Sequence, residues 1–141
     1  MSCLFESEVN ALQEALDDEF KAWATYDQVI HDFGPIRPFI NIRDSEARHI
    51  DALLRVFRDH ELTLPKNPWI GKTSRYDSVA SACADAVQAE IENAALYERI
   101  MRSSERPEIL AVFRNLHDAS QQRHLPAFRR CVQRNRRQDS A

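Results

Sequence analysis

Glycine is scarce in this chain of 141 residues, which has only Gly34 and Gly71. A sheet protein of this size needs more glycines in its turns, so the scarcity favours an all-α fold. The sequence also lacks any apolar run of about 18 residues, the length that would suggest a membrane span. Its first residues show neither the basic region nor the apolar run of a signal peptide. We therefore expect no membrane partner.

Cysteine is equally sparse, with Cys3, Cys83 and Cys131 far apart and odd in number. This spacing excludes the paired cysteines of a zinc finger. Cys83 and Cys131 fall on apolar helix stripes, where a free cysteine behaves as a small hydrophobe. The sequence thus predicts free thiols and a reducing, cytoplasmic location.

A strong charge of one sign is absent too, since the net charge is −3. This balance argues against nucleic acid as a partner. The exception is the segment 129–137, which holds five arginines. We interpret it as a short basic C-terminal tail, the solvated end of a helix, because cations are favourable near a helix C-terminus.

Apolar residues recur at alternating intervals of three and four, as in a helix that buries one face in a bundle. The pattern predicts helices over about 6–33, 38–60 and 78–103, and from Pro107 onward. The first stripe reads Phe5, Val9, Leu12, Leu16, Glu19, Trp23, Tyr26, Ile30 and Phe33. The fourth reads Leu110, Phe113, His117, Ser120, His124, Ala127 and Cys131. Gly34-Pro35 is a helix-stop signal, and Pro107 suits a first helical turn.

The connections between these helices differ in length. Short links join the first helix to the second and the third to the fourth, so each pair should form an antiparallel hairpin. The long segment at about 61–77 can span the whole length of a helix. The sequence predicts one domain, 1–141, in which a long crossover loop joins two hairpins. We expect Trp69 and Ile70 to fix this loop to the bundle.

Five residues in the predicted apolar seams are ionisable. They are Glu19, Glu46, His49, Glu90 and His124. A buried carboxylate is costly unless it is paired or binds a metal, and here every helix contributes one or two such groups. Glu46 and His49 lie about one turn apart on one face. The oxygen-rich set favours Fe or Mn over Zn. On the third helix either Glu90 or Glu92 could serve, and the seam spacing favours Glu90.

The second Glu-x-x-His pair is incomplete, because Gln121 stands three residues before His124. Gln121 and Asn93 are additional candidate ligands through their amide oxygens. We expect an asymmetric site that is weaker near His124. Tyr26 and Tyr97, seven residues after Glu19 and Glu90, are expected beside the ligands. Asp44 or Asp118 is expected to hold the second ring nitrogens of the two histidines, and His117 is interpreted as structural.

Segments 18–22 (DEFKA), 39–53 (FINIRDSEARHIDAL) and 124–128 (HLPAF) resemble helix signatures of small proteins in the ferritin-like superfamily. The resemblance implies a ferritin-like four-helix bundle with two Fe ions, or Fe and Mn, the second ion being less firmly expected. It implies redox chemistry with O2 or peroxide of the ferroxidase or peroxidase kind, a separate electron-donor protein and, by analogy, a homodimer. The alternative is a non-catalytic helical bundle, an interaction module with a degenerate or mononuclear metal site.

Overall fold

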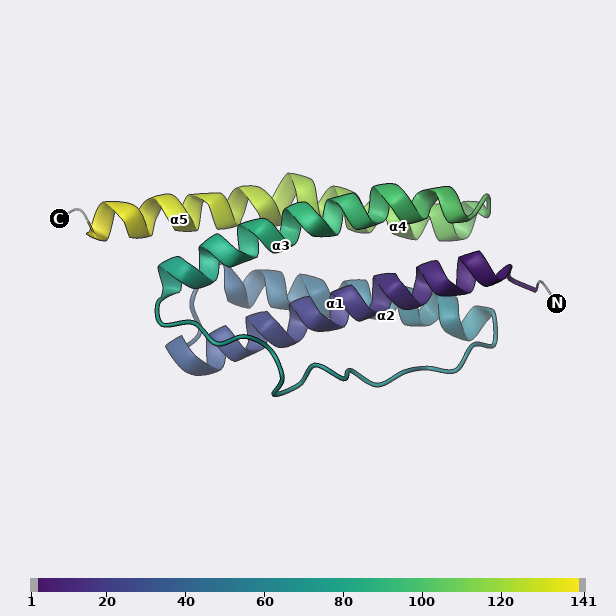
Figure 1. Cartoon of the computed structure of the whole chain (residues 1–141), viewed down its shortest axis with the longest axis horizontal. Coiled ribbons are helices and arrows are strands. Elements are labelled where there is room, and N and C mark those ends of the chain that lie inside the picture. The colour runs from purple at the N-terminus through teal and green to yellow at the C-terminus, as the bar shows by residue number, and fades with distance from the viewer. Residues whose placement is uncertain (1–2, 140–141) are drawn as a thin grey trace.

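The computed structural model describes residues 3–139, which form helices joined by loops and contain no strand. The elements are α1 (Glu6–Phe33), α2 (Phe39–Asp59), α3 (Val79–Ile100), the 3-10 helix η1 (Met101–Ser103), α4 (Pro107–Ala119), the π-helix η2 (Ser120–His124) and α5 (Leu125–Asp139). The segments α4, η2 and α5 follow one another without a break, so they make the fourth rod of a four-helix bundle (Figure 1). No helix in this range is both long and apolar enough to cross a membrane.

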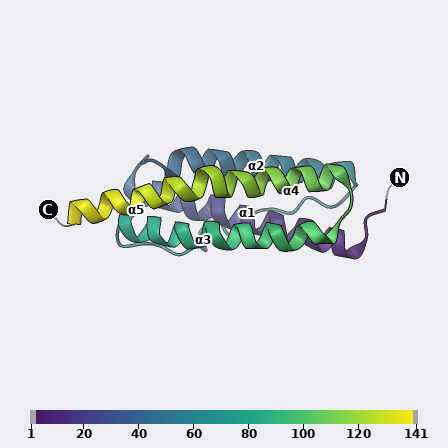
Figure 2. The ribbon, with the colours of Figure 1, turned by 90° about the horizontal axis from the view of Figure 1, so that it is seen from above.

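The four rods are arranged as a square. Helix α1 packs along α2 and α3 along α5, while α1 also touches α3 and α2 touches α4. Figure 2 shows α3 beside the α4–α5 rod, and Figure 1 shows the segment 60–78 returning along the bundle from the end of α2 to the start of α3. The α1–α3 face and the face between α2 and the fourth rod are therefore opposite sides of the molecule.

The returning segment is attached to α1 by polar contacts. Trp69 is half-buried, and its indole N–H donates to Asp17 at 3.0 Å. The Asn67 side-chain amide donates to the Phe20 carbonyl at 3.0 Å, and farther along the segment Arg75 pairs with Asp32. The expectation for Trp69 is confirmed, whereas that for Ile70 was wrong, because Ile70 is 56% exposed.

The helix boundaries follow local chemistry. Gly34 has φ of 94°, a left-handed value that suits glycine, and its N–H donates to the Ile30 carbonyl at the end of α1. At the other end of α1 the predicted stripe was wrong by part of a turn. Phe5 is 73% exposed, and Glu8 is buried in its place with hydrogen bonds from Ser104 and Arg106. These bonds satisfy the buried carboxylate and join α1 to the loop before α4.

The apolar core consists of two clusters. One contains Leu12, Leu16, Leu53, Phe57, Tyr97, Ile100 and Phe113 among others. The other contains Tyr26, Val29, Phe39, Ile42, Cys83, Ala86 and Phe128. Apart from Glu8 near the start of α1, the buried polar residues of each rod lie at or near the junction between the stretches that belong to the two clusters. The polar set thus lies in the middle of the bundle, where two apolar layers limit its access to water.

Cys83 and Cys131 form a disulfide between α3 and α5, with a Cα–Cα distance of 6.0 Å. The expectation of free thiols at these positions was wrong; Cys3 is free and exposed. The pairing arises because antiparallel packing of α3 on α5 brings two residues 48 positions apart to the same height. The reducing location was inferred from free thiols, so the disulfide removes the support for that inference.

Candidate metal centre

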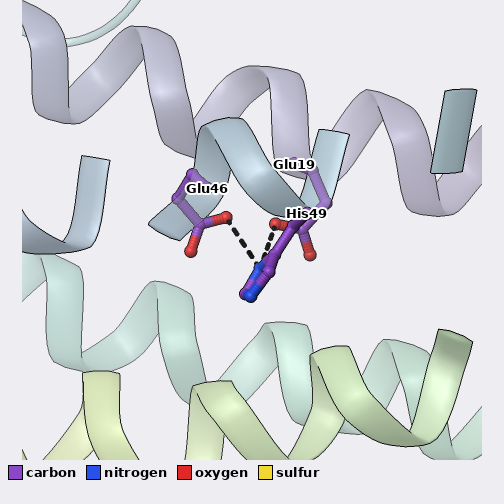
Figure 3. A group of neighbouring side chains, drawn as sticks. All are labelled: Glu19, Glu46 and His49. Carbon is purple, nitrogen blue, oxygen red and sulfur yellow. Dashed lines mark hydrogen bonds and ion pairs between the residues drawn. The ribbon is translucent and has the colours of Figure 1, made fainter. Parts of the chain in front are cut away.

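The first half of the polar set comes from α1 and α2. Glu19 replaces an apolar residue in the stripe of α1, while Glu46 and His49 lie one turn apart on the inner face of α2. The Nδ1 atom of His49 lies 3.4 Å from Glu19 Oε2 and 3.7 Å from Glu46 Oε2. Figure 3 shows both carboxylates turned toward this one ring. The three side chains form a compact triad, buried at its carboxylates and 9% exposed at His49.

The second half joins α2 to α3 and η2. The Nδ1 atom of His124 lies 3.0 Å from Glu46 Oε1 and 3.0 Å from Glu90 Oε1. Glu46 therefore presents one oxygen to each histidine and belongs to both triads. The rings of His49 and His124 stack with their centroids 5.5 Å apart. Two three-residue groups thus meet at one shared carboxylate.

The spacing of these atoms suits divalent ions. In each triad one ligand atom per residue lies within 4.8 Å of the other two. An ion that binds N and O at about 2.1 Å and at angles of about 90–110° separates neighbouring donors by about 3.0–3.4 Å. The shorter separations occur in the His124 triad. The expectation of a weaker metal site near His124 concerns affinity and stays a prediction.

The π-helix η2 is what brings His124 into the site. Buried residues of the fourth rod include Leu116, Ser120, His124 and Phe128, at three successive intervals of four. In an α-helix each such interval advances the position by about 40°, so the series would leave the core. The wider turn of η2 absorbs this drift, as π-bulges at functional sites often do. The sequence stripe missed it and assigned His117 to the core, whereas Leu116 is buried and His117 contacts Glu98.

Two serines that the sequence analysis did not assign to the site complete its hydrogen bonds. Ser45 Oγ lies 3.0 Å from His124 Nε2 and 3.4 Å from His49 Nε2, so one hydroxyl contacts both rings on the side away from the carboxylates. Ser120 donates to Glu90 Oε2 at 3.0 Å. The signal for Ser45 was its position four residues before His49, on the same helix face.

The aspartates expected to hold the histidines do not do so. Asp44 contacts Arg43, and Asp118 contacts His117. The Ser45 hydroxyl occupies the position that the sequence analysis gave to a carboxylate. This matters for a metal site, because the group bound to the second ring nitrogen sets the orientation of a ligating histidine.

The surroundings of Glu19 hold it in place. The Tyr97 hydroxyl donates to Glu19 Oε1 at 2.6 Å, and the Asn93 amide donates to the same oxygen at 3.3 Å. Asn93 also donates to Asp18 at 2.5 Å. Asp18 is half-buried, and burial raises its pKa to about 6. Asn93 thus turns its N–H groups, not its oxygen, toward the cluster.

The remaining candidates divide between the cluster and the surface. Glu90 is 3% exposed, whereas Glu92 is exposed and accepts a hydrogen bond from Gln88. The preference for Glu90 that the seam spacing gave is therefore confirmed as regards burial. Gln121 is half-buried and donates to the Glu90 backbone carbonyl at 3.5 Å. Tyr26 is buried between Phe39 and Phe128, in the apolar cluster next to the site.

Comparison with known proteins gives a fold but no activity. The chain is similar to the crystal structure of a hypothetical protein from Methanococcus jannaschii DSM 2661, with a TM-score of 0.84 and 23% identity, covering 96% of this chain and 85% of that one. At this identity the likeness shows the fold alone. No family model and no curated protein matches the chain. The chemistry of the buried cluster is therefore the main guide to function.

Without a metal, the cluster holds protons. Burial alone would lower the pKa of His49, but Glu19 and Glu46 raise it to about 10. Burial likewise opposes the charge on His124, and Glu46 with Glu90 raises its pKa to about 9. Burial and the charge of Glu46 raise the pKa of Glu19 to about 7. Two imidazolium groups thus compensate most of the carboxylate charge, so an entering cation must displace protons.

Proposed function

We propose that this chain is a ferritin-like metal-binding protein with a dinuclear Fe, or Fe and Mn, carboxylate centre that acts in redox chemistry with O2 or peroxide. The observation that supports this best is the pair of buried triads that share Glu46. Facing Glu and Glu-x-x-His groups in a bundle core are the ligand pattern of di-iron carboxylate proteins. The bound ions would supply the electrons passed to O2 or peroxide.

The protein's own groups have distinct tasks in this proposal. Glu46 would serve both metal positions, because one of its oxygens lies near each histidine, and His49 and His124 would each offer Nδ1 to one position. Tyr97 fixes the carboxylate of Glu19, and Ser120 fixes that of Glu90. Such outer hydrogen bonds keep the ligands oriented when protons give way to cations. The segment 60–78 runs back along the bundle from the end of α2 to the start of α3 (Figure 1), as the long crossover connection of a ferritin-like fold does.

An approach for cations exists on the α1–α3 face. A cavity of about 200 Å3 there reaches Glu90, and the charged residues that line it are mostly acidic, with Lys21 among them. Asp18, Asp85 and Glu92 contribute carboxylates to this lining, with Asn93 at its inner side. A negative, partly enclosed cavity concentrates cations near its inner end. Electrons for repeated turnover would come from a separate protein, and we propose a homodimer as the assembly.

The test starts from chelator-treated protein loaded anaerobically with Fe(II) or Mn(II), desalted and measured by elemental analysis. We expect about two ions per chain. Addition of O2 or peroxide to the Fe(II) protein should then produce a ligand-to-metal absorption band. Glu46→Ala should abolish both metal binding and the band. Glu98→Ala is the matched control, because it removes an exposed carboxylate of α3 that belongs to neither triad and does not line the acidic cavity.

Each result has a separate meaning. No bound metal in folded wild-type protein would overturn the metal proposal. About one ion per chain would replace the dinuclear centre with a mononuclear one. Two ions without any absorption change or Fe(II) oxidation above the buffer rate would refute the redox part alone.

One observation favours the non-catalytic alternative. The carboxylates, histidines and serines of the cluster satisfy one another without a metal, and in the described part of the chain only the Thr73 hydroxyl is buried without a hydrogen-bond partner. A polar network of this kind can serve to fix the register of a bundle. A folded protein that binds no metal would support this reading.

A further inference from the structure

A second cavity, lined with arginines, lies on the opposite side of the bundle from the acidic one. It is a cleft of about 440 Å3 beside α2, η2 and α5. Its charged lining is entirely basic and consists of Arg37, Arg48, Arg123, Arg130 and Arg134, with His124 at the inner end. Among the described residues no aspartate or glutamate lines it, although the chain as a whole has a net charge of −3. The arginine cleft is therefore a positively charged region on a protein whose net charge is negative.

The five arginines have no partner within the described part of the protein. Elsewhere Arg43, Arg75, Arg99 and Arg106 each pair with a carboxylate. No ion pair or hydrogen bond joins the side chain of any arginine of the cleft to another described residue. Like charges that converge on one hollow repel one another. A bound anion would relieve this repulsion.

The inner end of the cleft reaches the back of the metal centre. Ser45 and His124 line it, and these two residues are joined by the 3.0 Å contact between Ser45 Oγ and His124 Nε2. The carboxylates of the centre lie on the other side of the ring, at Nδ1. A ligand in the cleft would therefore lie behind Ser45 and would not occupy the positions between the carboxylates. The cleft is a separate site.

We propose that the arginine cleft binds a small organic oxyanion, a phosphate ester or a polycarboxylate. Arginine suits this ligand because its planar, permanently charged fork pairs with phosphate and carboxylate oxygens. Pro38, Ile42 and Ala127 provide apolar lining for the carbon part of the ligand. The volume lies within the range of small-molecule sites. A polynucleotide would need a longer basic track than this one cleft.

The experiment is calorimetric titration of metal-free protein with pyrophosphate and, separately, with citrate, at constant ionic strength. Two variants are compared with wild type: the double change Arg123→Gln with Arg130→Gln, and the single change Arg129→Gln. Arg129 is exposed on α5 next to Arg130 and does not line the cleft, so it is the matched control. We expect the double variant to bind at least about tenfold more weakly and the control within about twofold of wild type.

Tighter binding of pyrophosphate would assign the phosphate class, and tighter binding of citrate the carboxylate class. No binding of either anion by folded wild type would overturn the proposal, as would equal losses in both variants. A single-stranded oligonucleotide that binds more tightly than both anions, and is weakened equally by both variants, would overturn it in favour of a nucleic-acid surface. Metal-free protein is used so that these results do not depend on whether the chain binds iron.

Discussion

Raising the pH should destabilise the metal-free protein well before its lysines lose their charge. His49 has a pKa of about 10 in the fold, raised by Glu19 and Glu46 against the effect of burial. An unfolded histidine has a pKa of about 6.5. A group whose pKa is raised on folding contributes its full stability below the unfolded value and loses it as pH rises through the folded value. The contribution of His49 should thus fade between about pH 6.5 and 10.

His124 and Glu19 act in the same direction. The contribution of His124 should be lost as pH rises through about 9. The raised pKa of Glu19, about 7, means that the folded chain holds a proton that the unfolded chain releases. The stability that Glu19 contributes therefore falls as pH rises from 4.5, the ordinary pKa of a glutamate, to about 7.

One pKa unit corresponds to about 1.4 kcal/mol, but these groups share the same partners and their shifts do not add. We expect a total loss on the order of 3 kcal/mol between about pH 6 and 10. Urea unfolding of chelator-treated protein, followed by circular dichroism, measures it. The loss should be smaller in His49→Gln and unchanged in His117→Gln, whose histidine contacts Glu98 outside the cluster. Flat or rising wild-type stability from pH 6 to 10 would refute the assigned protonation of the cluster.

Four further outcomes follow from the same contacts. Glu46→Gln should lose both ions while Glu98→Gln keeps them, as elemental analysis would show, because only Glu46 belongs to both triads; loss of one ion alone would contradict the sharing. Ser45→Ala should weaken metal affinity by about 10–100-fold in competition titrations, since both ring nitrogens lose their partner; unchanged affinity would remove Ser45 from the site. Cys83→Ser should lower the free energy of unfolding by about 4 kcal/mol on the chain-entropy model for a 48-residue separation, measured with urea; an effect below about 1 kcal/mol would refute that model here. Gln121→Glu should leave the metal stoichiometry unchanged, because this side chain contacts the backbone of α3; added metal would refute that placement.

Much of the fold was predictable because helix periodicity and breakers are local signals. The expected first helix, 6–33, has the bounds of α1, and the other helices begin or end within a few residues of their predicted limits. Glu19, Glu46 and Glu90 could be found because each interrupts an otherwise apolar stripe. Their burial follows from the same spacing that buries their apolar neighbours.

Contacts that depend on register between helices were not predictable in this way. The Cys83–Cys131 disulfide requires the relative height of α3 and α5, which neither stripe contains. The same holds for Asn93 on α3, whose amide donates to Asp18 and Glu19 on α1. An apolar stripe predicts which face of its own helix a residue occupies. It does not predict which atom of a neighbouring helix that residue contacts. The polar contacts across the bundle therefore had to come from the structure.

The second Glu-x-x-His pair lacks its carboxylate in either helix geometry, but the π-turn of η2 changes which residue lies in its place. In an α-helix, a residue three positions before a histidine lies about 60° from it around the axis. In the π-turn of η2, with about 4.4 residues per turn, that separation grows to about 115°, while a residue four positions before lies within about 35°. Ser120, not Gln121, consequently shares the face of His124, where it donates to Glu90 Oε2. The carboxylates that serve His124 are supplied by α2 and α3, through Glu46 and Glu90, and the fourth rod adds a hydroxyl to hold one of them.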